Sequence, residues 1–224
     1  MNPDSTELPG AESARENLRV IRQLMERATI YRAILAGPAL IGGLCTLVVA
    51  GIMMGRPEAF SRTGFVLAWF AVYLVFDLVN TWLFYRDSKR RGVEFPSPQL
   101  LHGIMLLGPP IVVLGVIGLV FAWVHEDFVR CVLIWATGYG LGLLATSSFA
   151  PASIKWLGWS VLLIGFGLFL DHELTGFVAV DDPIVKSALI MAIVFGLLHV
   201  IYGIRSGSRA TERAGEEPGR QISD

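Results

Sequence analysis

The chain has 224 residues, of which 54% are hydrophobic and 17% charged, and its formal net charge is -1. A soluble domain has about a quarter of its residues charged. Here the apolar residues gather into long runs, which is typical of an integral membrane protein. The small net charge gives no basic surface for nucleic acid, so we expect no such partner.

The N-terminal region predicts a short tail followed by an amphipathic helix. Residues 1–12 are polar and contain two prolines, which favours disorder. A capping box, Ser13 to Glu16, then begins a helix over 13–36 with one apolar face. This helix either lies in the lipid headgroup region or packs on protein, and both alternatives stay open.

Six apolar segments predict an all-α membrane protein, a six-helix bundle. Most have close to the 20 or so residues that a helix needs to cross a bilayer. The expected spans are 39–54, 64–85, 98–124, 128–147, 154–170 and 184–204. They form a transmembrane domain over 37–204, and the polar residues 205–224 predict a disordered tail.

Residues with capping side chains mark where several spans begin. We expect Ser97, Asp127, Ser153 and Asp182 to accept hydrogen bonds from free backbone amides at helix starts. Inside the third span, the Pro109–Pro110 pair removes two backbone donors and predicts a kink. A broken helix that lines a site is the sharper alternative there.

Glycine-rich faces predict close helix contacts. The first span contains glycines at 42, 43, 51 and 55, and the fourth at 138, 140 and 142. Small residues let helix backbones approach closely in a membrane. The partner of such a face is another span, a second copy of the chain or a different membrane protein.

The charges predict which side of the membrane each loop faces. Fourteen of the 18 Lys and Arg residues fall in the N-terminal region, the 86–99 loop, the 148–155 loop and the C-terminal tail. The positive-inside rule therefore places both termini in the cytoplasm. The tryptophans form two interfacial belts: Trp69, Trp123 and Trp135 towards the outside, and Trp82, Trp156 and Trp159 towards the inside.

The segment Asn17-Leu18-Arg19-Val20-Ile21-Arg22-Gln23-Leu24-Met25-Glu26-Arg27-Ala28, followed by a glycine-rich span, resembles the start of a group of uncharacterised bacterial multi-pass membrane proteins. The similarity covers mainly residues 17–50 and the general layout. It implies a bacterial cytoplasmic membrane and carries no known chemistry.

An intramembrane polar site is expected around Asp77. Asp77 and Asn80 lie well inside the second span, where an ionised acid is costly unless it is paired or wetted. His199 in the last span falls at a similar depth, so it is the first candidate partner, and His102 is the second. The simpler alternative is that Asp77 reaches the headgroups or pairs with an inner arginine.

Two outer triplets are candidate metal ligands. They are His125, Glu126 and Asp127 after the third span, and Asp171, His172 and Glu173 after the fifth. Imidazole and carboxylate together suit a divalent transition metal. Ordinary solvated loop ends with one helix cap explain the same residues.

The leading functional interpretation is a non-enzymatic membrane protein: a sensor, a scaffold or assembly partner, or a small transporter. The alternative is a metal- or haem-dependent membrane enzyme, in which His102 and His199 would ligate the haem. Neither a His-Glu-x-x-His zinc motif nor a Gly-x-Ser-x-Gly elbow occurs in the sequence.

The predicted orientation can be tested with single cysteines in a background that lacks Cys45 and Cys131. A cysteine in the 86–95 loop should be shielded from a membrane-impermeant thiol reagent in intact cells. A cysteine at Gly176 should react. The opposite pattern would overturn the orientation.

Overall fold

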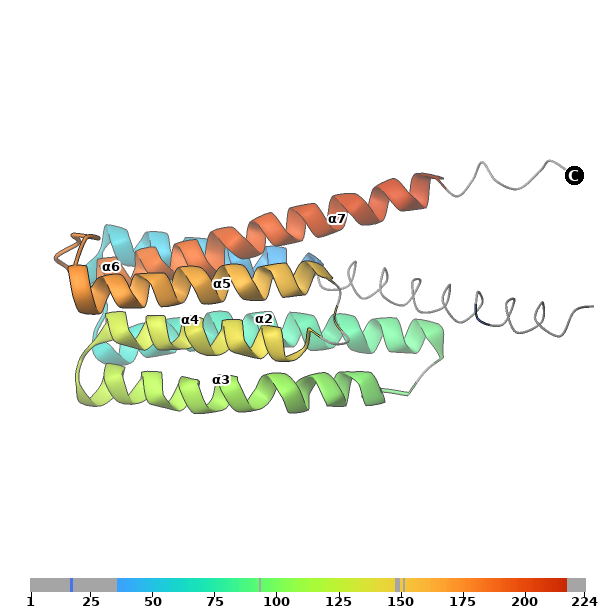
Figure 1. Ribbon diagram of the computed structural model, residues 1–224, viewed down its shortest axis with the longest axis horizontal. Helices are drawn as coiled ribbons and strands as arrows, with labels where there is room; N and C mark the ends of the chain where they lie inside the picture. The colour runs from blue at the N-terminus through green and yellow to red at the C-terminus, as the bar shows by residue number, and fades with distance from the viewer. Residues whose placement is uncertain (1–16, 18–35, 93, 148–149, 151, 217–224) are drawn as a thin grey trace, which may run out of the picture.

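A computed structural model describes residue 17 and the ranges 36–92, 94–147, 150 and 152–216. The predicted tail over 1–12 and nearly all of the amphipathic segment lie outside these residues. Within the described ranges there is no β-strand. Six helices are long and apolar enough to cross a membrane, which confirms the all-α six-helix bundle (Figure 1).

The spans are helices that run along a common axis. They are the first span Ala36–Gly55, α2 Arg62–Arg91, α3 Pro98–Val124, α4 Phe128–Ala145, α5 Ala152–Leu170 and a last span made of α6 Pro183–Met191, η3 Ala192–Leu197 and α7 Leu198–Glu216. Short η1 Pro57–Ala59 precedes α2, and η2 Asp171–Thr175 extends α5. The first span begins, and α7 leaves, at the same end of the bundle (Figure 1). We call this the inner end, after its predicted cytoplasmic side, and the other the outer end.

Three of the four predicted caps are present. The side chains of Ser97, Asp127 and Asp182 each accept a hydrogen bond from a backbone N–H two or three residues later. Ser153 was predicted wrongly as a cap, because α5 already begins at Ala152. Alanine is the strongest helix former, so the helical backbone starts one residue earlier.

The prediction of a disordered tail from residue 205 is wrong for its first part. The helix α7 continues from the last span to Glu216. The residues beyond 205 are rich in Arg, Ala and Glu, which are strong helix formers, so a polar composition does not end the helix.

The third span passes through its two prolines without a break. α3 is one helix from Pro98 to Val124 with Pro109 and Pro110 inside it. Membrane helices tolerate proline where neighbouring helices support the backbone. The broken helix considered from the sequence is therefore not formed.

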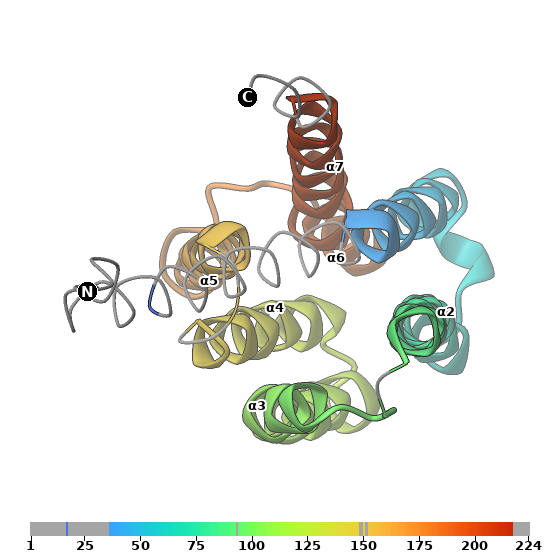
Figure 2. The same ribbon diagram turned by 90° about the vertical axis from the view of Figure 1, so that its right-hand side faces the viewer.

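The tightest packing in the bundle places α4 between α3 and α5 (Figure 2). A methyl group built on Gly138 would lie 2.7 Å from Cβ of Leu114 in α3. One built on Gly140 would lie 2.8 Å from the backbone nitrogen of Leu162 in α5. These glycines let α4 approach both neighbours at backbone distance.

A second glycine contact joins the first span to the last. A methyl group on Gly43 would lie 2.8 Å from the carbonyl oxygen of Gly196, and one on Gly203 would lie 3.0 Å from that of Ala36. The predicted close contacts are thus made within the chain. At Gly51 and Gly55 an added methyl group would meet no atom within 4 Å.

Helix α2 packs much less closely than α4. Only 6% of its most apolar stretch is buried, compared with 50% for α4. Its outer half is held by Phe65, which is fully buried and lies 4.6 Å from the ring of Phe128 at the start of α4. One face of α2 packs on the bundle, and the opposite face is exposed.

The close contact of α4 with α5 predicts a position-specific response to an added methyl group. Gly140→Ala should destabilise the protein by about 1–3 kcal/mol, because the methyl group meets backbone that cannot move aside cheaply. Gly167→Ala in α5, with open space around it, should leave the melting temperature unchanged or raise it slightly. Thermal unfolding in detergent measures both, and equal effects would contradict the packing.

Candidate functional site

A buried histidine lies near the middle of the last span. His199 is 4% exposed and lies directly after the π-helical turn η3, in the first turn of α7. Its Nε2 is 2.9 Å from the hydroxyl oxygen of Tyr139 in α4. Single π-helical turns inside α-helices are frequent at functional sites. The hydrogen bond between Tyr139 and His199 joins α4 to the last span.

Aromatic rings enclose this histidine. Phe195 stacks on the imidazole with ring centroids 6.1 Å apart, and Tyr139 lies at 5.4 Å. Phe76 of α2 meets it edge-on at 6.4 Å. Because α2, α4 and the last span all contribute, the imidazole sits where three elements meet. We call these four side chains the His199 cluster.

Asn80 lies one helical turn after Phe76, on the same inward face of α2. Its side chain is partly exposed overall, but its Oδ1 is buried and has no hydrogen-bond partner among the described residues. A buried amide oxygen without a partner costs free energy. Asn80 thus turns its Oδ1 inward, but the polar partner predicted for this atom is not present among the described residues.

Asp77 is not brought to His199. It is exposed on α2, and the hydrogen bond of His199 goes to Tyr139 instead. Consecutive residues of a helix point about 100° apart because there are about 3.6 residues in each turn. Since Phe76 faces His199, its neighbour Asp77 is turned towards the edge of that face. The sequence analysis placed Asp77 at the depth of His199 and expected its side chain to face the bundle interior, whereas in the structure this side chain is exposed.

His102 was the second candidate partner of Asp77. It is exposed near the start of α3. Viewed along the bundle, α3 and α7 lie on opposite sides of α4 (Figure 2). The structure therefore does not bring His102 to His199, the pair considered for haem, and haem binding stays an untested prediction.

At the outer end, an arginine joins the two acidic triplets. The guanidinium of Arg130 donates to both carboxylate oxygens of Glu173, at 2.6 and 3.0 Å, and to Asp127 at 2.8 Å. Arg130 lies in the first turn of α4, three residues after its cap Asp127. Paired hydrogen bonds from one guanidinium to a carboxylate are both strong and directional. This cluster connects the start of α4 to the end of α5.

The other residues of the triplets have separate roles. Glu126 forms an ion pair with Arg62 at the start of α2. Asp171 accepts backbone hydrogen bonds from Phe177 and Val178 and so closes the turn after α5. The ring of His125 packs on Phe121, and His172 is partly exposed.

No group of three or more His, Cys, Asp or Glu side chains in the described part of the chain is placed to hold a metal ion. Two of the six candidate ligands, Asp127 and Glu173, are hydrogen-bonded to Arg130. Metal binding by the outer triplets stays a prediction, which a measurement of the metal content of the purified protein would decide.

Sequence reasoning missed two residues of these clusters. Tyr139 stands between Gly138 and Gly140, and this small–large–small pattern marks a ring enclosed by close helices. Arg130 follows a predicted cap by three residues, the spacing at which side chains on one helix face meet. Its contact with Glu173 needs the fold, since 43 residues separate the two.

Comparisons with known proteins found no match. No protein-family model, curated protein or solved structure resembles the chain closely enough to be recognised. The function is therefore argued from the site itself.

The His199 cluster makes a testable prediction about stability. Tyr139→Phe should lower the free energy of unfolding by about 1–3 kcal/mol, because the buried Nε2 of His199 loses its partner. Tyr73→Phe is the matched control, since Tyr73 is 50% exposed. Adding His199→Leu to Tyr139→Phe should recover part of the loss. Thermal unfolding of the four proteins in detergent tests this, and an unaffected Tyr139→Phe protein would rule out a stabilising bond.

Proposed function

We propose that the chain is a non-enzymatic assembly partner in a membrane, and that α2 binds a helix of a different membrane protein. The observation that supports this is the exposed carboxylate of Asp77 on a helix of which only 6% of the apolar stretch is fully buried. The six apolar helices make the chain compatible with a multi-pass membrane protein.

Asp77 lies deep in the span. It follows Arg62 by 15 residues and precedes Arg86 by nine. At about 1.5 Å per residue these separations are about 22 Å and about 13 Å along the axis. Both arginines mark ends of the apolar stretch, so Asp77 falls inside a hydrocarbon core about 30 Å thick. An acid facing lipid there is costly and therefore points to a polar partner.

Residues around Asp77 form a continuous face of α2. This α2 outer face consists of Leu67, Phe70, Tyr73, Leu74, Asp77 and Thr81, all exposed. Phe70 is 57% exposed and Tyr73 50%. Aromatic residues that surround one buried polar group are typical of the centre of a protein interface. The face thus has the composition of a binding surface.

The charge of Asp77 favours a different protein over a second copy. Two copies packed through α2 in the same orientation would set Asp77 against Asp77 at equal depth, and like charges at close range disfavour that contact. A helix that presents Lys, Arg or a hydrogen-bond donor at this depth would satisfy the carboxylate. Membrane helices commonly associate through such polar pairs.

The proposal is tested by photo-cross-linking in native membranes. A photoreactive amino acid at Leu74 should cross-link to one distinct protein, and the adduct should disappear in Asp77→Leu. The same amino acid at Leu163 of α5, which is 62% exposed, is the matched control and should label lipid. Mass spectrometry then identifies the cross-linked protein and the peptide that carries the adduct.

A charge swap makes the result specific. Asp77→Lys should abolish the adduct, and exchange of the partner's basic residue for Asp should restore it. An adduct with a second copy, lipid labelling alone at Leu74, or an adduct that persists in Asp77→Leu would contradict the proposal.

A further inference from the structure

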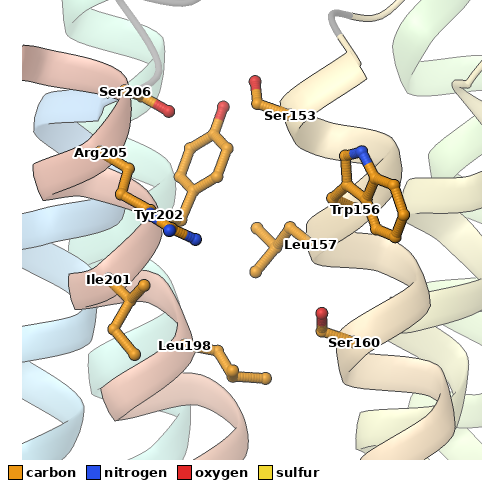
Figure 3. A pocket seen from close by; sticks show the side chains of 9 residues that line it. All are labelled: Ser153, Trp156, Leu157, Ser160, Leu198, Ile201, Tyr202, Arg205 and Ser206. Atoms are coloured by element: carbon orange, nitrogen blue, oxygen red, sulfur yellow. The ribbon is translucent and has the colours of Figure 1, made fainter. Parts of the chain in front are cut away.

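A groove of about 380 Å³ lies between α5 and α7 near the inner end of the bundle (Figure 3). Side chains from both helices line it, with Trp156 and Leu157 on α5 and Tyr202 and Arg205 on α7. One end of the groove is polar and the other is mostly apolar. A groove with two such ends suits an amphipathic ligand.

One end of the groove is polar. The hydroxyl groups of Ser153, Tyr202 and Ser206 gather there, and the guanidinium of Arg205 points towards the middle of the groove (Figure 3). The Oγ atom of Ser153 is buried and has no hydrogen-bond partner among the described residues. Ser153 also lies in the first turn of α5, where free backbone amides and the helix dipole favour an anion. Hydroxyl groups, a guanidinium and a helix start together suit a phosphate.

The other end is mostly apolar, with the hydroxyl group of Ser160 at its margin (Figure 3). Leu157, which is 8% exposed, points into the groove from α5, and Leu198 and Ile201 line it from α7. Trp156 is 74% exposed at the edge of the groove. Tryptophan is enriched at the interface between hydrocarbon and headgroups. An extended hydrocarbon chain matches these walls.

The groove lies at the depth where headgroups meet hydrocarbon. Its polar end is beside the start of α5 at Ala152, and the apolar run of the last span ends at Ile204, directly before Arg205. The same end of the bundle carries the basic residues Arg86, Lys89 and Lys155. A positive inner surface attracts anionic lipid.

We propose that this groove binds a phospholipid with a net anionic headgroup. Its phosphate accepts hydrogen bonds from Arg205 and the three hydroxyl groups, and one acyl chain lies along Leu157 and Leu198. A free phosphate ion would use the polar end only and leave the apolar walls unfilled. The proposal is independent of the partner helix on α2.

The test is lipid binding measured by native mass spectrometry of the full chain released from detergent. Dioleoyl phosphatidylglycerol, dioleoyl phosphatidylcholine and inorganic phosphate are titrated separately. The parent should bind phosphatidylglycerol most tightly. Arg205→Gln should weaken that binding roughly fivefold, the effect of one interfacial cation. Arg205→Lys should retain most of it, since a lysine also binds phosphate.

Lys155→Gln is the matched control, because Lys155 is exposed at the same end of α5 but does not line the groove. It should bind phosphatidylglycerol like the parent, and equal melting temperatures of all variants show that each is folded. Equal affinity of the parent and Arg205→Gln, or an equal loss in Lys155→Gln, would overturn the site. If the parent bound phosphatidylcholine or inorganic phosphate as tightly as phosphatidylglycerol, the proposal of an anionic phospholipid as the ligand would be wrong.

Discussion

The bundle depends on how closely helix backbones approach one another. In a bilayer, lipid tails solvate apolar side chains as well as a neighbouring helix does, so helices associate through tight packing and polar contacts. Gly138 and Gly140 supply that packing on the two sides of α4, and Gly43 supplies it between the first and last spans. Arg130 adds a polar contact between α4 and α5, and the pair of Tyr139 with His199 adds one between α4 and the last span.

Helix α2 is the exception to this arrangement, and this explains the proposed function. Aromatic side chains hold it, with Phe65 against α4 and Phe76 against His199. Its outer face is exposed and contains a carboxylate at membrane depth. A helix that is loosely held and carries an unsatisfied polar group has the properties of a subunit contact. The same surface would be hard to explain in a chain surrounded by lipid alone.

The sequence predicts well how far along its helix each residue lies. It predicts poorly which neighbour the side chain faces. Span limits and the caps Ser97, Asp127 and Asp182 follow from local patterns, since each capping bond joins residues two or three apart. The depths of Asp77 and His199 follow from helix rise. Their pairing failed because the direction in which Phe76 and Asp77 point depends on contacts between distant segments. The hydrogen bonds of Arg130 with Glu173 also depend on contacts between distant segments, so the sequence did not predict them.

The central claim is that the α2 outer face is covered by protein in the native membrane. A hydrophobic carbene-generating label that dissolves in the bilayer measures this directly, because it modifies only side chains that lipid touches. Helices α2 and α3 are each 6% buried over their apolar stretches, so the isolated chain in detergent should be labelled on both. In native membranes the account predicts strong labelling at Val112 and Val116 of α3 and weak labelling at Phe70 and Leu74 of α2. Equal labelling of the two helices in native membranes would contradict it.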